Sequence, residues 1–228
     1  AVLRRAREKQ DTPRAQGYSA AGVVLEVGEG AEAFQAGDRV AVAGATCAYH
    51  AERVVVPVNL AARIPDGVGF AEASSVALGA IAMQGVRRAN LQLGEFVAVI
   101  GCGALGLLTV QMLRAAGCRP LALDLNTERL ELAAVLGAEL TTNAADENAV
   151  KRVVQYCNGH GADAVIITAA TDSNEPLLQA FQMARRKGRV VLVGVVGKEF
   201  SREEMYAKEL DFVISTSYGP GRYDDDYE

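Results

Sequence analysis

Cysteine is scarce in this sequence, and no two cysteines have the spacing of a redox or metal-binding pair. The chain has 228 residues and four cysteines, none of them in a CxxC pair: Cys47, Cys102, Cys118 and Cys157. This pattern argues against a disulfide framework. It predicts a reduced, cytoplasmic protein in which the cysteines serve mainly as small apolar side chains.

A block rich in Lys and Arg is also missing. The formal net charge is -5 and the isoelectric point is near 5.2, so the phosphates of a nucleic acid would be repelled and no nucleic-acid partner is expected. The chain starts at Ala1, and no signal-peptide pattern follows. Because the last residues, 223–228, form an acidic run with two tyrosines, we expect a fragment that is cut at both ends.

Charged residues are absent from residues 96–113, a stretch about as long as a membrane-spanning helix. Gly101, Gly103 and Gly106 interrupt this stretch, with β-type residues before them and helix formers after them. A buried strand that turns into a buried helix explains the pattern better than a membrane span. Half of all residues are hydrophobic, which is enough for one large domain, or for one domain and part of another.

From about residue 94 onwards, short apolar runs alternate with amphipathic segments. The predicted strands are residues 96–100, 120–124, 140–142, 162–169, 189–196 and 212–217. The predicted helices are residues 105–116, 127–137, 146–157 and 173–187, followed by a short helix that Ser201 and Glu204 would open as a capping box. Parallel neighbours need helical crossovers, so the predicted fold class is α/β, with a doubly wound, six-stranded parallel Rossmann sheet.

Residues 17 to about 70 have a different character. Short β-rich runs at 23–27, 39–43 and 52–57 are separated by glycine-containing turns, which predicts a small, mostly β module. A helix over residues 70–89 would connect this module to the Rossmann part. The predicted organisation is a polar remnant (1–16), the β module with its helix (17–93), the Rossmann domain (94–218) and a truncated tail (219–228).

The segment Gly101-Cys102-Gly103-Ala104-Leu105-Gly106 matches GxGxxG between the first predicted strand and the first predicted helix. In this context Gly101 permits a tight turn, Gly103 lets the backbone approach a pyrophosphate, and Gly106 allows the helix to pack closely on the strand. The N–H groups of Ala104 and Leu105 would point at the phosphates from a helix N-terminus. A purely structural glycine turn is the alternative.

Asp124 ends the second predicted strand, where a carboxylate accepts hydrogen bonds from the hydroxyls of the adenine ribose. Its charge would repel the 2′-phosphate of NADP, so NAD is favoured over NADP as the cofactor. A solvated turn aspartate is the alternative. Asn126 and Arg129 lie just beyond and are candidates for the adenosine side, although an exposed helix arginine explains Arg129 equally well.

The ends of the fourth and fifth predicted strands would reach the nicotinamide half, because ligands of open α/β sheets lie at the carboxyl ends of strands. Ala169 ends the fourth predicted strand, and Gly194 and Val195 lie near the end of the fifth. Cys102, inside the glycine loop, is expected to pack there rather than to react.

The run from Ala21-Gly22-Val23-Val24 through Val27-Gly28 to Gly37-Asp38-Arg39-Val40 resembles the GroES-like catalytic domain of the medium-chain dehydrogenase/reductase family, the zinc alcohol dehydrogenase superfamily. Residues 94–137 are similar to the nucleotide-binding core of that family, and the whole resemblance covers about residues 17–218. It implies a partial GroES-like domain, an NAD(P)-dependent oxidoreductase activity on a small molecule, and the homo-oligomer that the family commonly forms through the sixth strand.

A narrower resemblance is to bacterial bi-domain oxidoreductases. It is carried by residues 17–22 (GYSAAG), 78–82 (LGAIA) and 215–223 (STSYGPGRY). In those proteins a second oxidoreductase half of the Gfo/Idh/MocA type follows, and they tend to be associated with surface polysaccharide or sugar metabolism. The resemblance implies such a C-terminal domain in the full-length protein and a sugar-like substrate.

The zinc ligands of the family are not repeated in this sequence. The Gly-His-Glu of the zinc-dependent members is Gly17-Tyr18-Ser19 here, and hydroxyls do not replace imidazole as zinc ligands, so no zinc is expected. Cys47 with His50 and Cys157 with His160 have C-x-x-H spacing, which is plausible zinc chemistry. However, several predicted elements separate the two pairs, and nothing in the sequence brings them together.

Without zinc, hydrogen-bond donors must stabilise the charge on the substrate oxygen. Tyr18 is the first catalytic candidate and His50, as a proton relay, the second; the alternatives are that Tyr18 packs between domains and that His50 is structural. The sequence thus predicts a zinc-independent, NAD-linked oxidoreductase of alcohol or carbonyl substrates. Two alternatives stay open: a non-catalytic nucleotide-binding module that supports a second oxidoreductase domain, and an NADPH-dependent reductase similar to quinone oxidoreductases.

Overall fold

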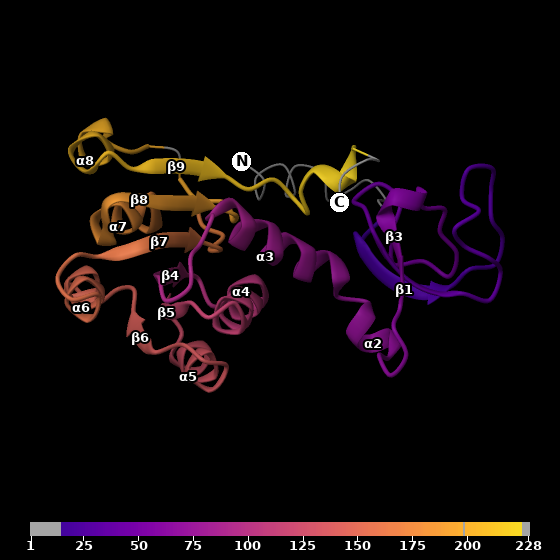
Figure 1. The fold of residues 1–228 in the computed structure, drawn as a ribbon, viewed down its shortest axis with the longest axis horizontal. Helices are drawn as coiled ribbons and strands as arrows, with labels where there is room; N and C mark the ends of the chain where they lie inside the picture. The colour runs from indigo at the N-terminus through magenta and orange to yellow at the C-terminus, as the bar shows by residue number, and fades with distance from the viewer. Residues whose placement is uncertain (1–14, 198, 225–228) are drawn as a thin grey trace. The chain divides into compact units, whose positions relative to one another are not determined.

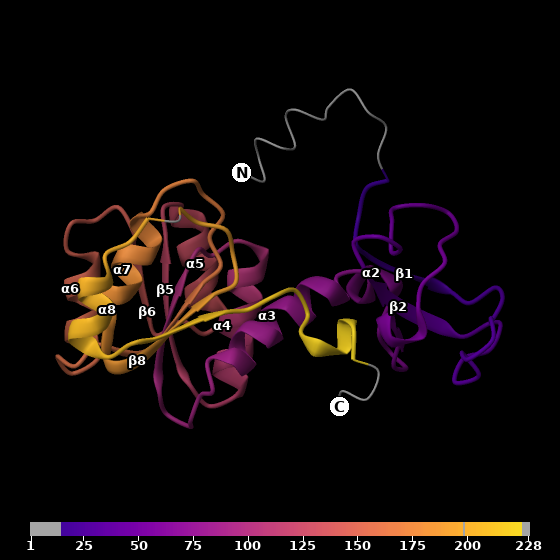
Figure 2. The same ribbon diagram turned by 90° about the horizontal axis from the view of Figure 1, so that it is seen from above.

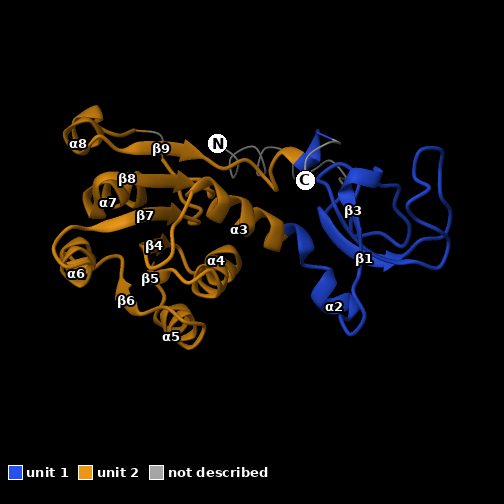
Figure 3. Ribbon diagram, in the orientation of Figure 1, with its two compact units in different colours: residues 1–77, 221–228 blue, residues 78–220 orange. Residues whose placement is uncertain are grey.

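The computed structural model describes residues 15–197 and 199–224 of the chain, drawn in Figure 1 and, seen from above, in Figure 2. The chain divides into two compact units (Figure 3): residues 1–77 with 221–228, and residues 78–220. The predicted polar remnant (1–16) and tail (219–228) lie partly outside the described residues.

The larger unit is built on a six-stranded parallel sheet with the strand order β6-β5-β4-β7-β8-β9. Its strands are β4 (Phe96–Ile100), β5 (Arg119–Asp124), β6 (Leu140–Asn143), β7 (Ala162–Ile167), β8 (Ala184–Leu192) and β9 (Asp211–Ile214). The chain runs outward from β4 to β6 and then continues on the other side of β4, so the strand order reverses at β4. The predicted doubly wound α/β fold is confirmed.

Helices cover both faces of this sheet (Figure 1, Figure 2). They include α4 (Ala104–Ala115), α5 (Thr127–Val135), α6 (Ala149–Tyr156), α7 (Glu175–Met183) and α8 (Arg202–Lys208). On one face Val153 of α6 and Phe181 of α7 share a core with Ile167 of β7. On the other face Val110 of α4 shares a core with Val99 of β4. Because both faces are buried, the central strands are continuous apolar runs rather than alternating ones.

The charge-free residues 96–113 form β4, the glycine loop and most of α4. The prediction of a buried strand followed by a helix is therefore confirmed. Within the described ranges, no helix is long and apolar enough to cross a membrane.

The helix predicted to run to residue 187 ends at Met183, so this prediction was wrong. Ala184 already has extended backbone dihedrals (φ -66°, ψ 140°) and pairs with Ala162 of β7. The ammonium of Lys208 donates to three backbone carbonyls at the end of α7 at 2.6, 2.8 and 2.9 Å, those of Gln182, Ala184 and Phe181. These bonds satisfy carbonyls that a helix end leaves without partners.

Three predicted strands end earlier than expected. The strand predicted over residues 162–169 ends at Ile167, because the N–H groups of Thr168 and Ala169 both donate to the carbonyl of Ile100 and turn the chain. The strands predicted over 189–196 and 212–217 end at Leu192 and Ile214.

The capping box predicted at the start of α8 is only half formed. Ser201 does cap the helix, since its hydroxyl accepts the N–H of Glu203 at 3.1 Å. Glu204, the expected reciprocal partner, instead accepts a hydrogen bond from Nε2 of Gln182 at 3.1 Å. A tertiary contact to α7 has replaced the local one.

The smaller unit contains a three-stranded antiparallel sheet, β1 (Ser19–Val23), β2 (Arg39–Ala43) and β3 (Ala61–Arg63). β2 has its predicted bounds. The strand predicted over residues 23–27 was misplaced, because residues 19–23 pair with the whole of β2. The prediction of a strand over residues 52–57 was also wrong, because the strand that pairs with β2 on this side is β3. Pro57 has no N–H to donate to a sheet, and it precedes a short 3-10 helix (Val58–Leu60).

The helix predicted over residues 70–89 is interrupted. It forms α2 (Phe70–Ala73) and α3 (Val76–Arg88), separated by Ser74 and Ser75. The hydroxyls of both serines donate to backbone carbonyls three residues earlier, at 2.7 and 2.9 Å. Such local bonds compete with the regular helix pattern and explain the break.

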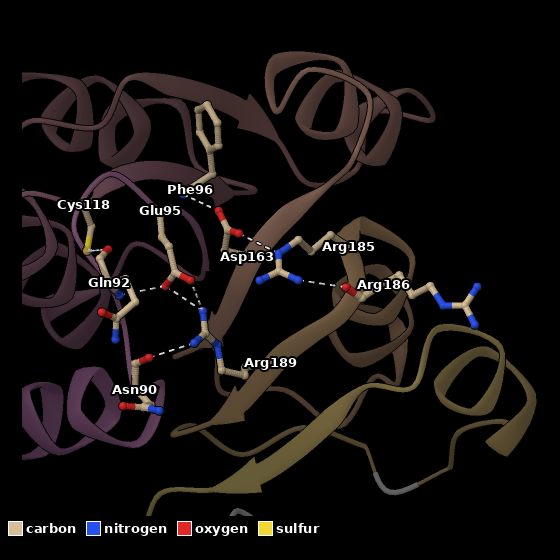
Figure 4. Close-up of polar contacts among 9 residues, drawn as sticks. All are labelled: Asn90, Gln92, Glu95, Phe96, Cys118, Asp163, Arg185, Arg186 and Arg189. Atoms are coloured by element: carbon tan, nitrogen blue, oxygen red, sulfur yellow. Dashed lines mark hydrogen bonds and ion pairs between the residues drawn. The ribbon is translucent and has the colours of Figure 1, made fainter.

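Charged side chains of β8 join the amino ends of β4 and β7 (Figure 4). Arg189 of β8 donates to both carboxylate oxygens of Glu95, which directly precedes β4, at 2.7 and 2.6 Å. Asp163 of β7 accepts the N–H of Phe96 at 2.9 Å and the Nε–H of Arg185 at 2.6 Å. Two ion pairs thus tie three neighbouring strands together at the edge opposite their carboxyl ends.

Thr142 of β6 is expected to weaken the fold slightly. Its side chain is buried, and its hydroxyl has no hydrogen-bond partner in the described part of the chain. Thr142→Val keeps the shape and removes the unpaired polar group, so we expect the free energy of unfolding to rise by about 1 kcal/mol. Urea unfolding measures this change, and a fall in the unfolding midpoint would show that the hydroxyl does have a partner.

Candidate functional site

The glycine loop lies at the carboxyl end of β4, where the strand order reverses. Gly101 has a φ of +99°, and a Cβ there would lie 2.7 Å from the backbone nitrogen of Ala169. A Cβ at Gly106, in the first turn of α4, would overlap the carbonyl oxygen of Gly101. At Gly103, by contrast, a Cβ would meet nothing within 4 Å. Two of the glycines are therefore needed for packing, and the third borders open space.

The N-terminus of α4 faces this space with free backbone donors. Gly103 is the N-cap residue and has no side chain that could cap the helix. Leu107 is the first residue whose N–H donates into the helix, to the carbonyl of Gly103 at 2.9 Å. Among the described residues, the N–H groups of Gly103, Ala104 and Leu105 meet no acceptor. Such a set of donors is suited to a phosphate group.

Asp124, at the end of β5, lies directly beside the glycine loop. Its carboxylate is 8% exposed and accepts the N–H of Cys102 at 2.6 Å and the N–H of Asn126 at 2.9 Å. A guanidinium nitrogen of Arg129 lies 3.8 Å from the same carboxylate. Asn126 caps α5, since its side-chain oxygen accepts the N–H of Arg129 at 3.1 Å. The three predicted adenosine-side residues are thus neighbours.

The two predicted nicotinamide-side segments are also brought together. The N–H of Val195 donates to the carbonyl of Ala169 at 3.0 Å, and a Cβ at Gly194 would overlap that same carbonyl oxygen. Since Ala169 also packs against Gly101, the segments that follow β4, β7 and β8 are in contact with one another. The side chain of Val195 is half exposed.

The two catalytic candidates lie in the smaller unit, whereas the glycine loop lies in the larger one. The Tyr18 side chain is partly exposed, and its backbone carbonyl accepts the N–H of Gly44 at 2.9 Å. The His50 ring lies against Gly17, where a Cβ would come within 2.7 Å of the imidazole Nε2. The structure therefore brings His50 next to the Gly17-Tyr18 segment.

The C-x-x-H pairs do not form a metal centre in the described ranges, where no group of three or more His, Cys, Asp or Glu side chains could hold a metal ion. One pair, Cys47 and His50, belongs to the smaller unit, and the other, Cys157 and His160, to the larger. Burial raises the pKa of the Cys157 thiol to about 12, which disfavours the thiolate that a metal would need.

Alkylation should distinguish the cysteines. Cys102, Cys118 and Cys157 are buried, and burial raises the pKa of the Cys102 thiol to about 12, with the Asp124 carboxylate adding to the effect. Since the thiolate is the reactive form, we expect iodoacetamide at about pH 8 to modify only the partly exposed Cys47 in the folded chain. Peptide mass spectrometry should find all four modified in urea. Rapid labelling of Cys102 in the folded chain would contradict this burial.

Thr168 is a site residue that the sequence did not single out. It follows β7 directly, and its hydroxyl donates to the carbonyl of Gly101 at 2.5 Å. The only sequence signal was its position, a hydroxyl residue at the end of a buried strand. That signal does not say which backbone atom the hydroxyl contacts.

Two family profiles match the chain. The profile described as "Zinc-binding dehydrogenase" matches residues 104–228, and the profile described as "Alcohol dehydrogenase GroES-like domain" matches residues 2–82. These matches agree with the two types of sheet in the structure.

Individual proteins are similar as well. The (R,R)-butanediol dehydrogenase of Bacillus subtilis is 30% identical, over 88% of this chain and 64% of the relative, so the chain spans less than two thirds of that protein's length. The solved alcohol dehydrogenase TADH from Thermus sp. ATN1 is 28% identical (TM-score 0.79; 89% of this chain, 69% of that chain). The solved quinone oxidoreductase of Pseudomonas syringae is 25% identical (TM-score 0.73; 90% of this chain, 64% of that chain).

The dehydrogenase profile covers more than half of the chain, and the parallel sheet with its glycine loop agrees with it. The chain belongs to the zinc-binding dehydrogenase family, which is the medium-chain dehydrogenase/reductase superfamily that its sequence resembles.

Proposed function

We propose that this chain belongs to an NAD-dependent dehydrogenase that transfers a hydride, without a catalytic zinc ion, between nicotinamide and an alcohol or carbonyl carbon of a small substrate. The observation that carries the proposal is the Asp124 carboxylate beside a helix N-terminus with unused N–H donors. A ribose diol and a pyrophosphate are neighbours in a dinucleotide, and these are the two groups that such donors and acceptors bind.

The residues at the strand ends fit this cofactor. A Cβ at Gly103 would point into open space beside the N–H groups of Ala104 and Leu105, which would hold the pyrophosphate. Asp124 would accept the hydroxyls of the adenine ribose, with Asn126 and Arg129 beside it. Ala169, Gly194 and Val195 would line the nicotinamide half. The nicotinamide ring itself supplies or accepts the hydride.

The side chains of residues 18 and 19 do not fit a catalytic zinc ion. The hydroxyl of Ser19, at the place of the family's glutamate, donates to the carbonyl of Ser74 at 2.6 Å and accepts the N–H of Ala77 at 3.1 Å. Tyr18 offers a phenol where zinc would need imidazole. In the proposed reaction, therefore, the Tyr18 hydroxyl donates a hydrogen bond to the substrate oxygen, and His50 relays the proton.

A relative of known name points to a class of substrate. The similar protein from Bacillus subtilis is named for butanediol, a small vicinal diol, and a sugar-like substrate carries the same secondary alcohols. The same proposal has three further parts. They are an oxidoreductase domain that follows this chain, self-association through β9, and a cytoplasmic location.

A specific observation favours one competing function. The Arg129 guanidinium, 3.8 Å from Asp124, is placed where it could attract the extra phosphate of NADPH. The similarity to a quinone oxidoreductase supports the same alternative, an NADPH-dependent reductase.

Calorimetric titration of the full chain with NADH and with NADPH tests the proposal. We expect NADH to bind at least about tenfold more tightly, a difference of about 1.4 kcal/mol, and Asp124→Ser to reduce that preference. Tighter binding of NADPH would favour the competing function, and no binding of either would refute both.

Turnover needs a separate measurement. Loss of NADH absorbance with a panel of small ketones, aldehydes and keto-sugars should depend on Tyr18, so that Tyr18→Phe lowers the rate without changing NADH affinity. NADH binding without turnover of any substrate in the panel would leave the non-catalytic module as the better account.

A further inference from the structure

One peptide bond of the glycine loop is held at both ends by side chains from neighbouring strands. The carbonyl oxygen of Gly101 accepts the Thr168 hydroxyl at 2.5 Å, from the end of β7. The N–H of Cys102, on the other side of the same peptide bond, donates to the Asp124 carboxylate at 2.6 Å, from the end of β5. Because a peptide unit is planar, fixing both groups fixes the orientation of the whole unit.

This peptide unit would otherwise have unusual freedom. Gly101 has a φ of +99° and no side chain, so its backbone has more accessible conformations than that of any other residue type. Its carbonyl oxygen also lies so close to Gly106 that a Cβ there would overlap it. A rotation of the Gly101–Cys102 unit would therefore change the contact between this oxygen and the first turn of α4, which carries the unused N–H donors.

We propose that Thr168 is a positioning residue for the cofactor's pyrophosphate, which acts through Gly101 by locking this peptide unit. The inference rests on the proposed function, since it concerns how the same site holds a dinucleotide. Thr168 is only partly buried and directly follows β7, the strand next to β4, so its hydroxyl reaches the carbonyl without a bridging group. Asp124 locks the opposite end with one oxygen, and it accepts the Asn126 N–H with the other.

The arrangement predicts for which part of the cofactor the binding affinity depends on Thr168. The pyrophosphate would be bound by the N–H groups that follow the locked peptide unit, whereas the adenosine would be bound mainly by Asp124. Loss of the hydroxyl should therefore weaken ligands that carry the pyrophosphate and spare adenosine. A residue that only stabilises the fold would affect both ligands alike.

The test compares Thr168→Val, which keeps the branched shape but loses the hydroxyl, with Thr168→Ser, which keeps the hydroxyl. Thr168→Ala replaces the valine variant if that variant does not fold. Thr142→Val is the matched control, because it is the same substitution at a hydroxyl without a hydrogen-bond partner in the described structure. NADH affinity is measured by its fluorescence on the full chain, and adenosine affinity by competition with NADH.

We expect Thr168→Val to weaken NADH by about five- to tenfold, the size of one lost hydrogen bond, and to change adenosine affinity by less than about twofold. Thr168→Ser should restore NADH binding, and the control should bind both ligands as the unsubstituted chain does. If the valine variant binds NADH as tightly as the unsubstituted chain, or if it loses affinity for NADH and adenosine equally, the inference is wrong. Either result leaves the proposed function intact. Failure of the unsubstituted chain to bind NADH overturns the proposed function and this inference with it.

Discussion

Substituting alanine for Gly106 is expected to lower the free energy of unfolding of the larger unit by about 3 kcal/mol and to remove measurable NADH binding. The new methyl group would overlap the Gly101 carbonyl oxygen and would lie 3.0 Å from the Thr168 hydroxyl. Both neighbours are held in place, since one is backbone and the other is hydrogen-bonded to it. The chain can accept the methyl group only by moving α4 away from β4.

Two other glycines provide the controls for this experiment. Gly103→Ala adds a methyl group in open space at a φ of -72°, so its free energy of unfolding should change by less than about 1 kcal/mol. If the proposed cofactor site is right, this variant should still lose NADH affinity, because the methyl group enters the space of the pyrophosphate. Gly79, in α3, also borders open space, so Gly79→Ala should lower neither the free energy of unfolding nor the affinity for NADH.

Thermal unfolding with and without NADH separates these outcomes. A Gly106→Ala chain as stable as the unsubstituted one would show that α4 can shift at little cost, contrary to the packing described above. A Gly103→Ala chain with full NADH affinity would show that the pyrophosphate lies elsewhere.

The second large effect is expected at the opposite edge of the sheet. Arg189→Met should lower the free energy of unfolding by about 3 kcal/mol, because it leaves the Glu95 carboxylate without its cation. The side chains of this ion pair are only 16% and 14% exposed, so water replaces the lost contacts poorly. The substitution also removes the hydrogen bond, 2.7 Å long, from Arg189 to the carbonyl of Asn90 (Figure 4).

A double-mutant cycle tests whether the lost pair is the cause. Glu95→Gln combined with Arg189→Met should be less destabilised than the sum of the single variants, since no unpaired charge remains. Arg186→Met is the matched control, because its ion pair with Glu209 is well exposed at 71% and 52%, and exposed pairs contribute little. If the changes in the free energy of unfolding of the two single variants add up to that of the double variant, the two side chains are not coupled in solution.

The sequence predicted the central part of this fold well because two signals coincided there. The apolar run before Gly101 and the amphipathic run after Gly106 have different periods, and glycines mark the change between them. The predicted bounds of β4 agree with the structure, and those of α4 differ by one residue at each end. The same glycines pointed to the loop whose packing the structure describes.

Several of the errors share one physical cause, which is that a distant or competing polar partner decided the local structure. Lys208 caps α7 from more than twenty residues away, and Gln182 takes the glutamate that would have completed the capping box of α8. Ser74 and Ser75 interrupt a segment whose composition favours a helix. Thr168 was missed for a similar reason, since its role depends on which carbonyl lies opposite it in a neighbouring strand.

The ion pairs at the amino ends of β4 and β7 are separated from the glycine loop by the length of β4. β4 has five residues, which corresponds to about 16 Å, more than the range over which substitutions usually influence one another. Thermal robustness can therefore be engineered at one edge of the sheet while ligand preference is redesigned at the other, because the two sets of substitutions would contribute independently.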